Sequence, residues 1–409
     1  MNSDALFMYT GVQRKYVGRA DGDERFRRMM QKANGRMRNV EELRCLAMMM
    51  VVALHFLGKG GLLGDVTAES MGTVGSAAWV LEAFCIVAVN VYMLISGYFL
   101  SEASFKLSRL LKLYLQIWMY SVGVGVFAIF TGIVPAGEVD THFLLSLLFP
   151  VSMGHYWFMT AYVFLYLLLP IVGTAVKSMT KGQLKLVLTM LLSVFCVLKS
   201  VMPFRMEEDG QGYDVLWYLC VFLVAAYVRR YGIGFLQKRW HCICLYLGGV
   251  GLVLAELFAL RAIYLHNGSL GLILKISTEY NHLSVLLAAL GLFGWFLRGK
   301  GGGILGRVAA WAAPYTLGVY LLHENIGLRY GWQGLFGAGN IRTVPQLLIG
   351  TVAAALCVFI TGVITELARN YAVRGVGALL ARFKPWRELM ERLGRADRLF
   401  AKREEPAGL

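Results

Sequence analysis

Long apolar segments recur along the whole chain and constrain its fold more than any other feature. About ten of them approach the twenty residues that an α-helix needs to cross the hydrocarbon core of a bilayer. Only 16% of the residues are charged, and such a chain would expose too much apolar surface in water. We therefore predict an all-α, polytopic membrane protein with about ten transmembrane helices. Their expected limits are residues 42–62, 78–100, 110–134, 155–176, 184–202, 214–230, 242–264, 280–298, 308–324 and 344–368.

The Lys and Arg residues alternate between abundant and sparse from one predicted loop to the next. The two tails and the even-numbered loops hold 32 of the 40 cations, and the odd-numbered loops hold seven. Because basic loops stay on the cytoplasmic side of a membrane, this pattern predicts that both termini are cytoplasmic. The net charge of +15 is then explained by membrane orientation, and no nucleic-acid partner is expected.

The chain divides into a membrane domain and two basic tails. Residues 1–40 are predicted to be a cytoplasmic tail, with the natural start at Met1 or Met37, and residues 41–368 form the membrane domain. Residues 369–409 mix apolar and basic side chains, which predicts a helix on the anionic inner leaflet. A solvated basic tail is the alternative interpretation of this last segment.

Ionisable side chains in the first apolar segment are the strongest indication of a functional site. Such groups are costly inside a membrane and are usually functional. Arg44 and His55 are eleven residues apart, so on a helix they share a face, differ by about 20° and stand about 16 Å apart. Glu41 lies one turn before Arg44 and can pair with it. The alternatives are an interfacial arginine that reaches the headgroups and a structural histidine.

Further polar residues lie at the ends of later segments, on the same predicted side as His55. They are His155 with Trp157, Asn281 with His282, and His323 with Glu324. Trp157 by itself is typical of an interfacial aromatic anchor. No H-E-x-x-H motif, paired CxxC motif or carboxylate cluster indicates a metal, so none is expected.

The order of several short motifs resembles the membrane acyltransferase-3 family. The first is Arg44, ten residues and then His55, directly after the segment NVEEL at 39–43. The others, in the family's order, are NVYMLISGYFL at 90–100, SRLLKL at 108–113, HYWF at 155–158 followed by Pro170, LWY at 216–218 with Arg229 and Arg230, YNHL at 280–283, and 315–323, which ends in YLLH. The similarity extends from about residue 38 to residue 368.

This resemblance implies transfer of an acyl group, usually acetyl, from a cytoplasmic acyl-CoA to a hydroxyl. The acceptors it implies are sugars of surface polysaccharides or lipid-linked glycans, and the location is a bacterial plasma membrane. On this interpretation His55 is the general base and His323 a second catalytic histidine, while Arg44, Arg109 and Lys112 hold the CoA phosphates. The candidates for substrate or oxyanion contacts are Glu41, Asn90, Ser96, Trp157, Tyr162 and Asn281.

A transporter or flippase of a lipid-linked sugar is the alternative function. It would show the same apolar segments and the same charge asymmetry. Transporters often contain two related halves, however, and Arg44 and His55 have no counterpart in the second half of this chain. A non-catalytic membrane scaffold would not need the Arg44 and His55 face.

Overall fold

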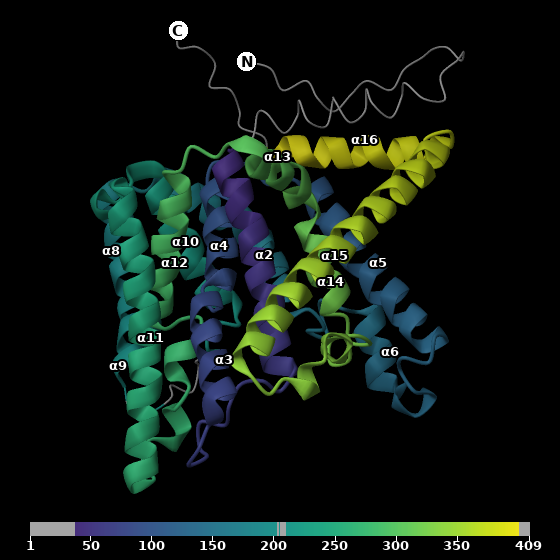
Figure 1. Cartoon of the computed structure of the whole chain (residues 1–409). Helices are drawn as coiled ribbons and strands as arrows, with labels where there is room; N and C mark the ends of the chain where they lie inside the picture. The colour runs from purple at the N-terminus through teal and green to yellow at the C-terminus, as the bar shows by residue number, and fades with distance from the viewer. Residues whose placement is uncertain (1–36, 203, 205–209, 401–409) are drawn as a thin grey trace.

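The computed structural model describes residues 37–202, 204 and 210–400, and this part of the chain is helical without any strand. Short 3-10 and π turns join the α-helices (Figure 1). The helices are α2 (Arg38–Lys59), α3 (Gly72–Cys85), α4 (Ala88–Leu100), α5 (Leu107–Phe130), α6 (Thr141–Leu148), α7 (Trp157–Ser178), α8 (Lys181–Leu192), α9 (Lys199–Val201), α10 (Val215–Tyr231), α11 (Arg239–Asn267), α12 (Leu283–Leu297), α13 (Gly303–Ala312), α14 (Thr316–His323), α15 (Val344–Leu380) and α16 (Lys384–Leu399).

Seven helical stretches of the described residues are long and apolar enough to cross a membrane. Each overlaps one predicted span. They are Gly72–Leu100, Leu107–Phe130, Trp157–Ser178, Lys181–Val201, Arg239–Asn267, Gly271–Leu297 and Val344–Leu380. The chain is therefore a multi-pass membrane protein with an all-helical fold.

The other three predicted spans are also helical but differ from a simple apolar helix. The first, α2, carries four charged residues in its first two turns. The sixth, α10, has only 17 residues. The ninth is divided into α13 and α14 by a 3-10 turn that contains Pro314, because proline cannot donate a helical hydrogen bond. The count of ten and the cytoplasmic location of the termini stay predictions.

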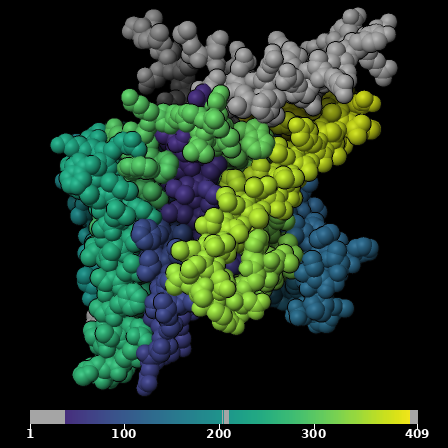
Figure 2. Space-filling view, in the orientation of Figure 1, coloured from purple at the N-terminus to yellow at the C-terminus, as the bar shows by residue number. Residues whose placement is uncertain are grey.

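Helix α2 lies inside the bundle, which explains how a helix with charged residues is accommodated. It packs against α3, α4, α12, α13, α14 and α15. Leu43, Ala47 and Phe56 on α2 are completely buried. Figure 2 shows α15 running diagonally beside α2 on one face of the molecule. The polar face of α2 is therefore directed at other helices of the bundle.

The helices around this centre expose large apolar side chains on their outer surfaces. Phe130 on α5, Ile171 on α7 and Ile349 on α15 are among the most exposed of them. A soluble protein would bury such residues. Their outward orientation fits a bundle whose outer solvent is lipid.

Helix α16 lies across one end of the bundle and closes back onto α5 (Figure 1). The Asp397 carboxylate accepts a hydrogen bond from the Ser108 amide at 3.0 Å, in the first turn of α5, and a second from the Ser108 hydroxyl. Partial burial acts to raise the pKa of Asp397, but the hydrogen bonds from Ser108 outweigh it and hold that pKa below its ordinary value. Phe400 packs edge-on against Phe105, with 5.1 Å between ring centroids.

Two glycines set the close approach of α14 to α15. A Cβ atom on Gly362 would lie 2.5 Å from the Cα of Val319, and one on Gly318 would lie 2.5 Å from the Cβ of Glu366. Small residues at such crossings let membrane helices pack backbone to backbone. This contact fixes the position of α14.

We expect Gly362→Ala to push α14 away from α15 and destabilise the protein by about 1–3 kcal/mol, the usual cost of overpacking. The measurement is the apparent melting temperature in detergent. Gly375→Ala is the matched control, because Gly375 lies on the same helix with open space around it. Equal melting of the two variants would contradict the tight α14–α15 contact.

Candidate active site

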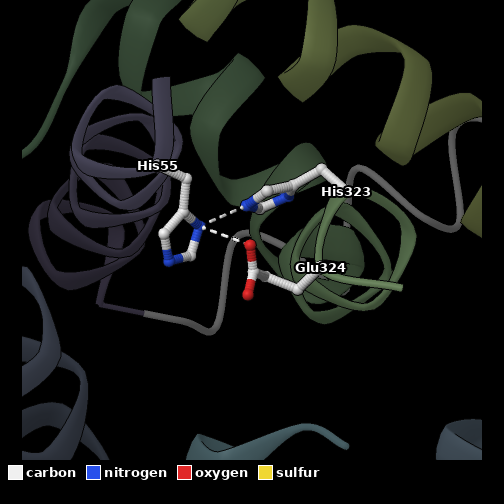
Figure 3. Close-up of side chains that lie close together, drawn as sticks. All are labelled: His55, His323 and Glu324. Atoms are coloured by element: carbon white, nitrogen blue, oxygen red, sulfur yellow. Dashed lines mark hydrogen bonds and ion pairs between the residues drawn. The ribbon is translucent and has the colours of Figure 1, made fainter. Parts of the chain in front are cut away.

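His55, His323 and Glu324 meet where α2 packs against the end of α14 (Figure 3). The Nδ1 atom of His55 lies 2.9 Å from Nε2 of His323 and 3.2 Å from Oε1 of Glu324. His55 and His323 are separated by 268 residues in the chain. The structure thus unites the two histidines for which the sequence predicts a catalytic role.

The hydrogen-bond partners determine where the protons lie on these two imidazole rings. Nδ1 of His323 is 2.6 Å from the carbonyl oxygen of Val319. A carbonyl only accepts, so Nδ1 of His323 carries the proton and, in the neutral ring, Nε2 accepts one from Nδ1 of His55. Nε2 of neutral His55 is then left with a free lone pair. Figure 3 shows this nitrogen pointing away from both His323 and Glu324.

Lys59 completes the cluster by forming an ion pair with Glu324 at the same carboxylate oxygen that faces His55. Glu324 is only 3% exposed, and a buried carboxylate needs a partner of opposite charge. Lys59 lies four residues after His55, on the same face of α2. That spacing, together with the adjacent His323 and Glu324, is the sequence signal that could have indicated this pair.

The same three side chains are spaced so that they could hold a metal ion. The ligand atoms of His55, His323 and Glu324 all lie within 4.8 Å of one another. A divalent ion would have to displace the Lys59 ammonium from Glu324 and break the hydrogen bond between the histidines. The donor set therefore favours a hydrogen-bonded proton-transfer group over a metal centre. The absence of a metal stays a prediction.

A cavity of about 340 Å³ runs along α2 and is lined by both Arg44 and His55. The two residues therefore share a face, as their spacing predicts, and the cavity extends for about 16 Å between them. Most of its wall is apolar, including Met48, Val51 and Leu113. The other predicted site residues in its lining are Ser96, Arg109, Trp157 and Tyr162.

Five predicted site residues are not part of this cavity's lining: His323, which contacts His55, and four others. Asn90 donates to the Tyr280 carbonyl at 2.7 Å and accepts from the Trp217 indole at 2.9 Å, so its amide supports the fold. The remaining three contact other groups. Asn281 accepts from Lys199, Glu41 pairs with Arg44 at 2.9 Å, and Lys112 lines a second, adjacent cavity.

Tyr320 is a cavity residue to which sequence reasoning gave no role of its own. It lies one turn before His323 on α14 and is 5% exposed. Its hydroxyl proton has no acceptor within the described part of the chain. Buried hydroxyl groups nearly always find a hydrogen-bond partner, so the unpaired hydroxyl makes Tyr320 a candidate for a ligand contact. Its spacing from His323 is the signal that could have identified it.

The model of the acyltransferase domain that defines the acyltransferase-3 family matches residues 38–364. The match covers most of the chain, so the protein belongs to the acyltransferase-3 family. Together with the apolar helices, this membership defines a multi-pass membrane acyltransferase. Neither a curated protein nor a solved structure matches the chain. Membership in this family favours an enzyme over the alternative of a transporter.

The ion pair between Lys59 and Glu324 should show a favourable coupling energy in a double-mutant cycle. Removing Glu324 alone leaves the Lys59 ammonium without its partner in a site where Lys59 is 20% exposed. We expect Glu324→Ala to destabilise the protein and the cycle with Lys59→Ala to give a coupling of about 1–3 kcal/mol. Stability is measured by thermal unfolding in detergent.

The matched control is a second cycle on the exposed pair of Lys384 and Glu388, whose charged atoms are 3.8 Å apart on α16. Both side chains are largely solvated, so their coupling should be close to zero. If the two cycles give the same coupling, the Lys59–Glu324 pair does not stabilise the cluster.

Proposed function

We propose that the protein is a membrane O-acyltransferase of the bacterial cell envelope. It would transfer an acyl group, with acetyl as the expected one, from cytoplasmic acyl-CoA to a hydroxyl of a surface or lipid-linked glycan. The observation that carries this proposal is one cavity that joins a cationic end, at Arg44 and Arg109, to the imidazole of His55. A donor with phosphates at one end and a thioester at the other matches such a cavity.

The cavity wall suits the donor along its length. Guanidinium groups bind phosphates through paired, charge-assisted hydrogen bonds, and Arg44 and Arg109 provide them at one end. The apolar middle of the cavity would enclose the flexible arm of CoA. The distance of about 16 Å along α2 then brings the thioester to His55.

His55 would act as the general base. Its Nε2 atom takes the proton of the acceptor hydroxyl as that oxygen attacks the carbonyl carbon of the thioester. The carbon–sulfur bond breaks, the ester forms, and the leaving CoA thiolate takes the proton from His55 to become the free thiol. The Glu324 carboxylate, 3.2 Å from Nδ1, would stabilise the intermediate imidazolium.

We place His323 as a positioning residue and not as a second base. Its Nε2 atom accepts from His55 and its Nδ1 atom donates to the Val319 carbonyl. Both nitrogens are therefore engaged, and their arrangement keeps the proton of His55 on Nδ1. This role is analogous to that of the residue that orients the base in a catalytic triad.

Tyr320 would stabilise the negative charge that develops on the thioester oxygen. It lines the same cavity as His55, and its hydroxyl proton finds no acceptor within the described residues. A hydrogen-bond donor held in a site without water stabilises an oxyanion strongly. Ser96, Trp157 and Tyr162 are further donors in the cavity wall.

Replacing His55 by Ala should abolish transfer, because His55 is the only candidate base among the described residues that line the cavity. Purified protein would be incubated with labelled acetyl-CoA and membrane glycans, and both CoA release and acceptor labelling measured. We expect a loss of about 10²–10⁴-fold without loss of membrane insertion. His142→Ala is the control, since His142 is exposed on α6. An active His55→Ala enzyme would refute the mechanism.

Tyr320→Phe should lower kcat by about 10²–10³-fold, the usual effect of one lost oxyanion donor, with little change in KM for acyl-CoA. Tyr218→Phe is a matched control, because Tyr218 also has a buried hydroxyl without a partner among the described residues but does not line the cavity. Removing that hydroxyl should leave kcat and the melting temperature unchanged. Full kcat in Tyr320→Phe would exclude the oxyanion role.

A further inference from the structure

A second cavity, of about 580 Å³, adjoins the first between α5, α13 and α15. The two cavities share Arg109, Leu113 and Pro314 in their walls. At the end of the bundle, α16 leads from α15 back to the start of α5 (Figure 1), where Asp397 holds the first turn of the helix that carries Arg109. The wall of this cavity is therefore built from three helices and joined to the proposed path of the acyl donor.

The lining of the second cavity carries an excess of positive charge. Glu366 is the only carboxylate that the described lining contributes. It is already satisfied, because Arg369 forms two hydrogen bonds to it at 2.8 and 2.6 Å and Gln116 donates a third at 3.0 Å. Glu366 therefore balances the charge of Arg369 but of no other cation in the described lining.

Three cations in this wall therefore have no partner of opposite charge among the described residues: Arg109, Lys112 and Arg374. Arg109 and Lys112 come from α5, and Arg374 comes from α15. Cations around a cavity whose single carboxylate is already paired form a site for an anion, and guanidinium groups favour phosphate.

An aromatic side chain stands in the same wall. Trp311 at the end of α13 is half-buried, and its ring packs edge-on near Tyr315 with 5.9 Å between centroids. Nucleobases stack on such side chains with little dependence on the base. Phosphate-binding cations and an aromatic surface in one cavity are the combination that a nucleotide requires.

We propose that this second cavity binds the nucleotide portion of the acyl donor, with Arg109, Lys112 and Arg374 on its phosphates and Trp311 against its adenine. The proposal rests on the function proposed above for the identity of the donor. Arg109 belongs to both cavities, so a phosphate bound there lets the rest of the molecule extend toward His55. The sequence assigns no role to Trp311 or Arg374, and only the packing of α13 and α15 against α5 brings them to this place.

An anionic phospholipid headgroup shares the phosphate chemistry, so the test must separate the two sources. The protein is placed in nanodiscs of phosphatidylcholine, and the probe is 3′,5′-adenosine diphosphate, which contains the nucleotide without the thiol arm. Binding is measured by titration calorimetry. We expect the wild-type protein to bind the probe, and Arg374→Gln and Trp311→Ala to weaken binding at least tenfold. Arg382→Gln is the matched control, since Arg382 follows α15 outside the cavity.

A kinetic measurement gives a readout that a merely structural defect would not produce. Arg374→Gln should raise KM for acetyl-CoA at least tenfold. The rise in KM caused by Arg374→Gln should be at least tenfold smaller with the acetyl thioester of N-acetylcysteamine as donor, because this donor lacks a nucleotide. An equal loss with both donors would overturn the proposal, because it would show that Arg374 does not act through the nucleotide.

Two further results would also overturn it. One is normal binding of the probe by both Arg374→Gln and Trp311→Ala. The other is a wild-type protein that does not bind the probe but prefers phosphatidylglycerol, with this preference lost in Arg374→Gln. That result would show that the cavity binds a lipid headgroup. Transfer from the short thioester that depends on His55 would still support the acyltransferase function in either case. Nucleotide binding without any transfer would contradict that function instead.

Discussion

The contact between α2 and the end of α14 is the interaction on which the rest of the structure depends. It places four ionisable groups in the interior of the bundle: His55 and Lys59 from α2, and His323 and Glu324 from the end of α14. Such groups are costly to bury alone. Each of them here has a partner from the other segment, so the two segments become stable in this environment only when they are packed together.

The close crossing of α14 and α15 stabilises this contact, because it fixes the position of α14. Gly318 and Gly362 let the two backbones approach, and the position of α14 in turn places Tyr320 in the cavity and His323 beside His55. The same helix α15 also contributes to the wall of the second cavity, through Glu366, Arg369 and Arg374. One helix thus links the geometry of the proposed base to that of the proposed donor site.

Much of the fold could be predicted from hydropathy, because the length of an apolar helix is a property of a single segment. All ten predicted spans coincide with helical segments, and seven of them qualify by length and composition. The others depart for local reasons, such as the charges on α2 and the turn at Pro314. The common face of Arg44 and His55 was predictable too, since it depends only on helical periodicity.

The candidate site could be predicted from the sequence only in part. Asn90 and Asn281 have the right chemistry for a substrate contact, but they bond to Tyr280, Trp217 and Lys199. Tyr320 lines the cavity, and its buried hydroxyl has no partner among the described residues. Whether a polar side chain serves the fold or faces a ligand depends on which neighbour it meets, and periodicity within one helix contains no information about that neighbour.

The sequence by itself determined the helical membrane architecture, the acyltransferase-3 family and the Arg44–His55 face, because each follows from residues close together or from ordered motifs. Only the tertiary structure decided that His55 bonds to His323, that Lys59 balances Glu324 and that α5 and α15 combine their cations around one cavity. The physical reason is that these pairings join residues up to 268 positions apart. They exist only after helix packing has chosen which faces meet.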